Sequence, residues 1–453
     1  MNAHIARAMQ SASEISIETA TSQKISADII PFPARGKQPE AEAEAVSVEL
    51  EPVELAIVAK NDNAPVGLPS AEPVVGASAL IERARLTRAV EIVNSVIEKR
   101  NTIPILSNVA LVGTGEALSL TGTDLDIEIA VTIPAAADRE FGTTLPAHLL
   151  KDLLKKATAS DFVAITTGED RDSLDFERVQ YHLQPLSLND WPHLAGPAAS
   201  AFTFQLPGKA FWDGIDSTMG AVSTEETRYY LNGIYLHTVE TEGGSQLRMV
   251  ATDGHRLYRQ DIDAPEGSAG MPDVIIPRKT VSLFHKLMKG KACPESVTIA
   301  VTETKVRLSF DDIVITSKTV DGTFPDYQRV IPAWNDKTAT MDADGAIEAI
   351  RAVSLISLIS RERGRSAKFT FTAGNCRLTV NNPDSGSAVA DIACDYDGDE
   401  FEIGFNAGYT MAIIEDARGN GSSFTMKFSD AGSPALVTGD RAGWMSCLMP
   451  MRV

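Results

Sequence analysis

The chain has 453 residues, 43% of them hydrophobic, which exceeds one hydrophobic core and suffices to fill two to four domains. Its 61 acidic and 41 basic side chains leave a formal net charge of -20. This balance argues against a protein that attracts nucleic acid by its overall charge, but it is compatible with one basic surface on an otherwise acidic molecule.

Cysteine usage and hydropathy exclude several further classes. Cys293, Cys376, Cys394 and Cys447 form no CxxC pair and have no His nearby at metal-ligand spacing, so we expect neither a zinc site nor a disulfide framework. No apolar run approaches the roughly 18 residues of a membrane span, and the N-terminus does not read as a secretory signal. We expect a cytoplasmic protein without cofactor, metal or membrane partner.

Residues 1–78 differ from the rest in composition. The stretch PFPARGKQPEAEAEAVSVELEPVE is rich in Pro, Ala and Glu and has few aromatic residues. Such a segment buries too little apolar surface to offset the entropy of ordering, so we predict a disordered N-terminal arm. The short apolar patch at 55–59 is either a partner-binding motif or incidental.

Three elements follow the arm in chain order. Residues 86–100 are predicted to form a helix at the start of the unit. Residues 117–131 alternate between apolar and polar residues on both sides of a polar turn, which predicts a β-hairpin. Residues 143–157 begin as a short strand and continue as a second amphipathic helix.

The same three elements then return twice. The turn residues Asp124, Asp253 and Asn382 are spaced 129 positions apart at each step. A period of this length indicates tandem domains, because solenoid repeats are far shorter. We predict an α+β protein with domains at 79–199, 200–327 and 328–453. The recurring elements are helices at 208–222 and 345–359, hairpins at 246–262 and 375–392, and strand–helix segments at 274–290 and 401–419.

Four motifs carry a family resemblance. They are RYYLNG at Arg228 to Gly233, MVATDGHRLY at Met249 to Tyr258, DGTFPDYQRV at Asp321 to Val330, and MPMRV at Met449 to Val453. In this order and at these separations they resemble the bacterial sliding clamp, the β subunit of DNA polymerase III, from about residue 79 onward. The resemblance implies three DNA-clamp domains per protomer and a head-to-tail homodimer that forms a six-domain ring. It also implies a processivity factor that encircles duplex DNA and tethers the replicative polymerase.

The ATDGHRLY motif also permits an enzymatic interpretation. Asp253 and His255 could act as carboxylate and general base, with Ser223 or Thr224 as nucleophile. However, no GxSxG elbow, HExxH motif or Gly-rich phosphate loop accompanies them. A tight turn in which Asp253 accepts hydrogen bonds from backbone amides explains the motif better. We therefore expect no catalytic residue, although the subunit shares the nucleotidyltransferase label of its holoenzyme.

The resemblance implies a peptide-binding pocket between the second and third domains. It would capture linear peptides of the replicative polymerase, the clamp loader and repair polymerases. Met449 and Met451 suit varied apolar side chains, although core packing is the alternative. Cys447 stands where a branched aliphatic residue is usual, and Val453 stands where Leu is commoner. The implied lining is Leu231, Thr252, Gly254, His255, Arg256, Leu257, Pro325, Arg329, Val330, Asn406, Tyr409, Cys447, Met449, Pro450, Met451 and Arg452.

DNA contacts are implied at loops and on helices. Arg100, Tyr229 and Tyr230 match loop positions that touch DNA in relatives. Such binding reads phosphate charge and not sequence, so it depends strongly on salt. Glu225 is acidic where a neutral polar residue is usual, which predicts weaker DNA binding. Candidate bore residues, which a solvated helix face explains equally well, are Lys151, Lys155 and Lys156 on one helix and Arg83, Arg85 and Arg88 on another.

The implied ring interface joins the first domain of one protomer to the third domain of the other. Matched positions place Tyr181 on one side and Leu355 with Ile356 on the other, although the latter two could be helix core. Two alternatives remain open. One is a divergent second clamp of plasmid or phage type with restricted partners; the other is a DNA-binding or peptide-binding scaffold that never closes into a ring.

Overall fold

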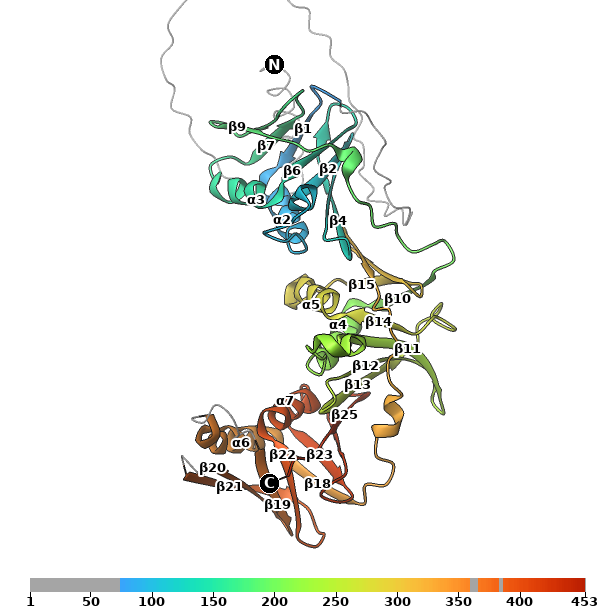
Figure 1. Cartoon of the computed structure of the whole chain (residues 1–453), viewed down its shortest axis with the longest axis vertical. Helices are drawn as coiled ribbons and strands as arrows, with labels where there is room; N and C mark the ends of the chain where they lie inside the picture. The colour runs from blue at the N-terminus through green and yellow to red at the C-terminus, as the bar shows by residue number, and fades with distance from the viewer. Residues whose placement is uncertain (1–73, 359–365, 383–385, 453) are drawn as a thin grey trace, which may run out of the picture. The chain divides into compact units, whose positions relative to one another are not determined.

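The computed structural model describes residues 74–358, 366–382 and 386–452 (Figure 1). The predicted arm therefore lies almost entirely outside the described residues, as do its apolar patch at 55–59 and the final residue, Val453. The first described strand begins at Ser78, and the preceding Ala77 is already buried.

The first third of the described chain holds two helices and nine strands. Helix α2 (Arg83–Val93) buries Leu86, Ala89, Val90 and Val93, which recur at three- and four-residue spacing along one face. The other elements are β1 (Ser78–Glu82), β2 (Asn108–Thr114), β3 (Ala117–Thr123), β4 (Ile127–Pro134), β5 (Ala136–Ala137), β6 (Phe141–Pro146), α3 (Ala147–Lys156), β7 (Phe162–Thr166), β8 (Asp172–Asp175) and β9 (Gln180–Leu183).

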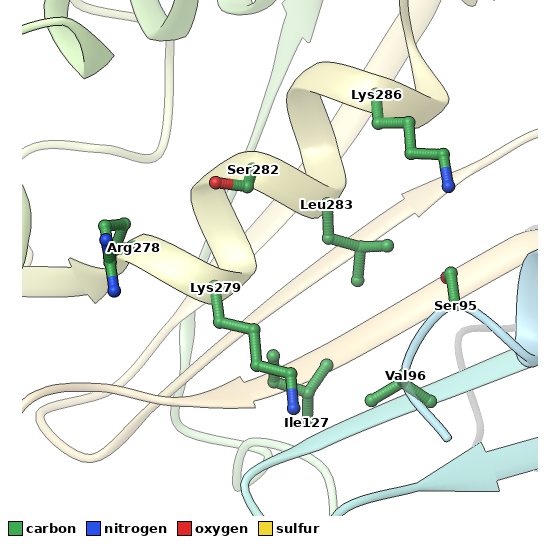
Figure 2. A pocket seen from close by; sticks show the side chains of 8 residues that line it. All are labelled: Ser95, Val96, Ile127, Arg278, Lys279, Ser282, Leu283 and Lys286. Carbon is green, nitrogen blue, oxygen red and sulfur yellow. The ribbon is translucent and has the colours of Figure 1, made fainter. Parts of the chain in front are cut away.

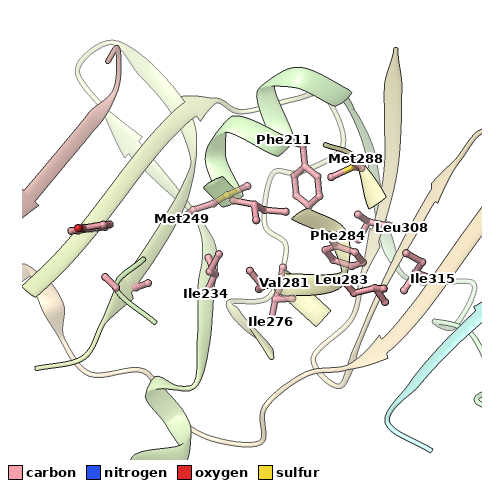
Figure 3. Close-up of a cluster of buried hydrophobic side chains, with 14 of the residues drawn as sticks. Phe211, Ile234, Met249, Ile276, Val281, Leu283, Phe284, Met288, Leu308 and Ile315 are labelled. Atoms are coloured by element: carbon pink, nitrogen blue, oxygen red, sulfur yellow. The ribbon is translucent and has the colours of Figure 1, made fainter. Parts of the chain in front are cut away.

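The middle third repeats this order. Its helices α4 and α5 pack their apolar faces onto one core, where Phe211 and Phe284 lie 6.2 Å apart between ring centroids (Figure 3). Its elements are β10 (Phe202–Pro207), α4 (Gly208–Met219), η3 (Glu226–Leu231), β11 (Gly233–Thr241), β12 (Gly244–Thr252), β13 (Arg256–Asp263), β14 (Val274–Pro277), α5 (Arg278–Leu287), β15 (Ser296–Val301), β16 (Lys305–Phe310) and β17 (Ile313–Lys318).

The last third repeats the order again. Apart from the two-residue strand β5 in the first third, each third is two successive units of strand, helix and three strands. This confirms the predicted helices and hairpins, although the first helix ends at Val93, short of residue 100. The elements here are η5 (Tyr327–Val330), β18 (Lys337–Asp342), α6 (Ala343–Leu358), β19 (Ser366–Thr372), β20 (Asn375–Asn382), β21 (Gly386–Asp395), β22 (Phe401–Asn406), α7 (Ala407–Arg418), β23 (Ser423–Phe428), β24 (Ala435–Gly439) and β25 (Trp444–Leu448).

Neighbouring thirds are joined by antiparallel strand pairing. Strand β17 of the middle third pairs with β4 of the first, and β13 of the middle third pairs with β25 of the last. The sheets therefore run across both junctions, in the orders β10-β15-β16-β17-β4-β3-β2-β6 and β14-β11-β12-β13-β25-β24-β23-β18-β21-β20-β19-β22. A third sheet, β5-β1-β7-β8-β9, belongs to the first third alone.

The repeated turns have the predicted structure. The Asp124 carboxylate accepts hydrogen bonds from the backbone N–H groups of Asp126 and Ile127, at 3.0 and 2.7 Å. Leu125 takes a φ of 78°, and Gly254 takes 87° at the matching position of the second turn. The third turn continues from Asn382 into residues 383–385, outside the described part.

Candidate functional site

Strands β13 and β25 bring the ATDGHRLY motif and the C-terminal segment together, side by side in Figure 1. Leu257 lies opposite Cys447 and Arg256 lies opposite Leu448 in the ladder. Beyond the ladder, the Met449 N–H donates a 2.9 Å hydrogen bond to the His255 carbonyl oxygen. Residues predicted from two distant motifs thus form one continuous surface.

The turn between β12 and β13 is built by Asp253. One carboxylate oxygen accepts hydrogen bonds from the N–H groups of His255 (2.9 Å) and Arg256 (3.0 Å), and the other accepts from Arg256 Nε at 3.2 Å. Asp253 is therefore occupied by backbone amides and a guanidinium, as the turn interpretation predicts. Gly254 is favoured by its φ of 87°, and a Cβ at this residue would lie 2.6 Å from Nη1 of Arg228, so the end of that flexible side chain would have to move.

Arg256 is held from several sides. Its guanidinium donates to the Tyr258 hydroxyl at 3.2 Å and to the carbonyl oxygen of Gly220, and it lies 4.5 Å from the Tyr409 ring centroid. The His255 ring also stacks on Tyr409, with ring centroids 6.0 Å apart. These contacts fix a cationic donor beside an aromatic surface at the junction of the last two thirds.

The floor beneath this surface is apolar. Leu231, Leu257 and Cys447 are buried in one cluster. Burial raises the pKa of the Cys447 thiol to about 12, so the side chain is neutral and acts as a small apolar residue. The cluster also contains Val250, Ile275, Phe324, Tyr327 and Met445.

The last third supplies a second wall. Asn406 caps α7, its side-chain oxygen accepting from the Tyr409 N–H at 3.1 Å. The Met451 N–H donates to the Gly404 carbonyl oxygen at 2.7 Å, which anchors the chain beside β22. Met449 and Met451 are 39% and 41% exposed, which contradicts the alternative that they are core residues. Two adaptable apolar side chains are thus presented to solvent.

The segment DGTFPDYQRV contributes a third side. Pro325, Arg329 and Val330 are exposed, and Arg329 pairs with Asp326 at 2.8 Å. Phe324 and Tyr327 alternate with them and are buried in the apolar floor. Sequence reasoning missed both aromatic residues, although their spacing within the motif is the signal that could have found them.

The loop around η3 carries the predicted DNA-contacting tyrosines. Tyr229 is 54% exposed, and its ring meets that of Tyr230 edge-on with centroids 5.8 Å apart. Arg228 of the same loop binds Glu225 and holds the pKa of that carboxyl below its usual range. Arg100 is exposed in the loop that follows α2.

Cationic side chains gather at the junction of the first and middle thirds. A cavity of about 490 Å³ is lined there by Arg278, Lys279 and Lys286 of α5, facing Ser95 and Val96 (Figure 2). A second cavity of about 670 Å³ is lined by Arg88, Lys151 and Lys286 among others. The three α5 cations were not predicted, because their helix was interpreted only by its apolar spacing.

The other predicted basic residues divide into paired and exposed groups. Lys155 forms an ion pair with Glu91 at 2.7 Å, and Lys156 is exposed. Arg85 pairs with Glu82. Arg83 was predicted to line a bore, but its Nε donates to the Ser160 carbonyl oxygen at 2.6 Å and it has a structural role within its own domain.

The predicted interface residues lie on two separate elements. Tyr181 lies on β9, the last strand of the five-stranded sheet, with its ring 5.9 Å from Phe176. Leu355 and Ile356 lie on α6, which packs against β20 and β21. Leu355 is 60% exposed and Ile356 is intermediate, so Leu355 is not core.

The four cysteines are free. Within residues 74–358, 366–382 and 386–452, no cluster of His, Cys, Asp and Glu has the composition of a metal site. Over the same residues, none of the helices combines the length and apolarity needed to span a bilayer.

The tandem repeat, the sheets shared across its junctions and the mixed apolar and cationic surface at the junction of the last two thirds define a three-domain DNA clamp. Family models of the DNA polymerase III β subunit match throughout: the N-terminal domain at residues 78–195, the central domain at 205–326 and the C-terminal domain at 328–452. The chain therefore belongs to the DNA polymerase III β subunit family, the bacterial sliding clamps.

Individual relatives agree. The β sliding clamp of Caulobacter vibrioides is 42% identical over 376 residues, covering 82% of this chain and 99% of the relative. That of Pseudomonas aeruginosa is 34% identical with the same coverage. The crystal structure of the Caulobacter crescentus clamp with bound PEG has a TM-score of 0.79 at 41% identity, covering 84% of this chain and all of that one. A Bartonella birtlesii clamp bound to griselimycin has a TM-score of 0.78 at 39% identity, covering 83% and 99%.

Proposed function

We propose that this chain is a DNA polymerase processivity factor: a homodimeric ring that encircles duplex DNA and tethers the replicative polymerase. It performs no bond chemistry of its own and acts in the cytoplasm. Within the ring the three thirds are DNA-clamp domains, with boundaries near 79–199, 200–327 and 328–453.

The observation that carries the proposal is the repeated junction. In the six units of strand, helix and three strands, the third strand of the triplet is β4, β9, β13, β17, β21 or β25. Strand β4 pairs with β17, and β13 pairs with β25. Both pairings join the first half of one domain to the second half of the next. The same rule applied once more pairs β21 with the β9 of another copy.

Strands β9 and β21 are both suited to pairing between two copies of the chain. On its outer side β21 pairs with β18 only through Cys394 and Asp395, and Val389 is 57% exposed. In β9, Tyr181 lies beside an open edge of its sheet. An exposed strand edge invites pairing, and closure into a ring satisfies it. Helix α6 with Leu355 and Ile356 packs on β21, so these residues accompany the same interface.

The surface where Arg256, Tyr409 and Met451 lie, at the junction of domains 2 and 3, would form a groove that binds partner peptides. Exposed Met449 and Met451 offer adaptable apolar contacts, and the fixed Arg256 guanidinium offers a directional donor. Linear peptides of the replicative polymerase, clamp loader and repair polymerases are the expected ligands. Arg329, Val330 and Arg452, exposed on its rim, would contribute to specificity.

Duplex DNA would contact the cationic side chains on helices α3 and α5 and the exposed loops. Lys151, Lys155 and Lys156 of α3 would act with Arg278, Lys279 and Lys286 of α5, joined by Arg100, Tyr229 and Tyr230 from loops. Contacts of this kind neutralise phosphates without reading bases, so they permit sliding.

Topology separates a ring from a scaffold. The protein is loaded with a clamp loader onto nicked circular DNA, and retention is measured by gel filtration before and after the circle is linearised. We expect retention on the circle and loss from the linear form, because a ring slides off an open end. Equal retention on both forms, or a strict monomer in sedimentation at micromolar concentration, would instead identify a DNA-binding scaffold.

A further inference from the structure

A row of three polar residues crosses the outer face of the middle domain. His237 on β11 lies directly opposite Arg248 on β12, and Arg248 lies directly opposite Asp261 on β13. His237 and Arg248 are 5% and 8% exposed. Arg248 binds Asp261 with two hydrogen bonds, of 2.7 and 2.9 Å. A buried polar network whose members are hydrogen-bonded to one another makes the structure around it rigid.

Two residues of this row, Arg248 and His237, form hydrogen bonds with the Tyr327 hydroxyl. This hydroxyl lies 3.2 Å from Arg248 Nη1 and 3.1 Å from His237 Nε2, and Tyr327 is 5% exposed. Arginine has no acceptor, so Arg248 donates to the phenol oxygen. The phenol proton is then free to be donated to His237 Nε2. That bond requires an imidazole whose Nε2 carries no proton.

The residues on either side of Tyr327 form a wall of the peptide groove. Phe324 stacks on Tyr235 with centroids 4.7 Å apart and rings 2° from parallel, while Pro325, Arg329 and Val330 face solvent. Two buried aromatic anchors therefore fix a short segment whose intervening residues are exposed. Of these anchors, only Tyr327 is held by directional bonds.

We propose that His237, Arg248 and Asp261 are positioning residues that fix the 324–330 segment through Tyr327 and so pre-organise one wall of the peptide groove. This inference rests on the proposed peptide-binding function. Pre-organisation lowers the entropy lost on binding, so releasing the segment weakens affinity even where no peptide contact is removed.

The groups that face His237 are Arg248 and Asp261 on the neighbouring strands, Tyr235 on its own strand, Tyr327 above it and Asp273 nearby. Burial lowers the pKa of His237 and Arg248 lowers it further, while Asp273 and Asp261 raise it. At neutral pH the imidazole is thus unprotonated and accepts from Tyr327. Acidification protonates it and removes that acceptor.

The test uses the full chain and a labelled peptide in which Gln is followed by aliphatic and aromatic residues. In Tyr327→Phe the ring remains and both hydrogen bonds are lost, so we expect about five- to tenfold weaker binding at pH 7.5. Without peptide, the backbone amides of residues 324–330 should exchange hydrogen faster in Tyr327→Phe than in the wild type. The matched control is Tyr396→Phe, which removes a 2.7 Å bond from a tyrosine of similar burial in domain 3. Its affinity should equal that of the wild type.

A pH series distinguishes positioning from general stability. Burial holds the pKa of His237 below its ordinary value of 6.5, so wild-type affinity should fall once the pH is lowered far enough below 6.5 to protonate the imidazole. His237→Gln should bind with little change over the same series, because an amide oxygen accepts from Tyr327 at any pH. Unchanged affinity in Tyr327→Phe, or equal pH profiles of wild type and His237→Gln, would overturn the inference. If the wild type binds no peptide but Tyr327→Phe still speeds exchange at 324–330, the proposed function fails and the positioning role stands.

Discussion

Arg228 and Glu225 form a two-pronged ion pair, with Nε donating to Oε2 at 2.7 Å and Nη2 lying 2.7 Å from Oε1. Another guanidinium nitrogen of Arg228 packs against Gly254 at the edge of the peptide groove. The pair therefore lies on the loop with the exposed tyrosines, next to the turn at Gly254. Glu225 does more than add negative charge near the proposed DNA contacts, because it also occupies a cation that phosphate could use.

Glu225→Gln should strengthen binding to duplex DNA. The change frees Arg228 for a phosphate, so the slope of log K against log salt should steepen by about 0.9. Fluorescence anisotropy across a salt series measures both. Glu226→Gln is the control, because it removes a neighbouring exposed charge without releasing Arg228. Equal slopes in the two variants would show that Arg228 does not reach DNA.

Gly254→Ala should weaken both folding and peptide binding. Residue 254 has a φ of 87°, so the variant suffers backbone strain, and its Cβ would displace the Arg228 guanidinium, whose Nη1 would otherwise lie 2.6 Å away. We expect a loss of about 1–2 kcal/mol in unfolding free energy. Gly115→Ala is the control, since residue 115 has a φ of 57° with open space around it. If only stability changes, and equally in both variants, then Arg228 is not coupled to the groove.

Asp416→Asn should change how stability depends on pH. Burial on α7 raises the pKa of this carboxyl to about 7, with Asp216 also raising it and Arg441 and Arg256 opposing. The folded state holds a proton that the unfolded chain releases near pH 4, so the stability contribution is full below pH 4. It is lost as the pH rises to about 7, by about 4 kcal/mol at most. Urea unfolding from pH 5 to 8 should show this decline in the wild type alone; parallel curves would contradict it.

Charging α6 should separate the protomers. Replacing Leu355 and Ile356 with Glu would place unpaired charge in the proposed interface, at a cost of several kcal/mol. Analytical ultracentrifugation should then show a monomer. Trp334→Glu is the control, because this 88% exposed residue lies in the segment between η5 and β18. A persistent dimer in the double variant would place the interface elsewhere.

Deleting residues 449–453 should abolish tight peptide binding and leave the fold intact. The deletion removes exposed Met449 and Met451 together with the hydrogen bond to Gly404. Loss of such anchors costs about 2 kcal/mol or more, which is roughly thirtyfold in affinity. Isothermal calorimetry measures this change, and thermal unfolding provides the control. Equal affinity in the two proteins would remove the groove from peptide binding.

Local patterns predicted the repeated elements well, because helix periodicity and the Asp-centred turns depend on neighbouring residues. The turn at Asp253 formed as expected for that reason. Long-range pairing was accessible only through the family resemblance, since nothing in β13 alone specifies β25 as its partner. Arg83 shows why a charged residue cannot be assigned to DNA from sequence alone. Its side chain donates a hydrogen bond to the carbonyl oxygen of Ser160, 77 residues away.

The thiol of Cys447 lies within the ladder that joins domains 2 and 3, and it is 3% exposed. A buried thiol with a raised pKa reacts with an alkylating reagent only when the structure around it opens. Its labelling rate therefore reports how often β25 separates from β13. Cys447 thus reports on opening of the junction between domains 2 and 3, and a bound peptide should lower its labelling rate.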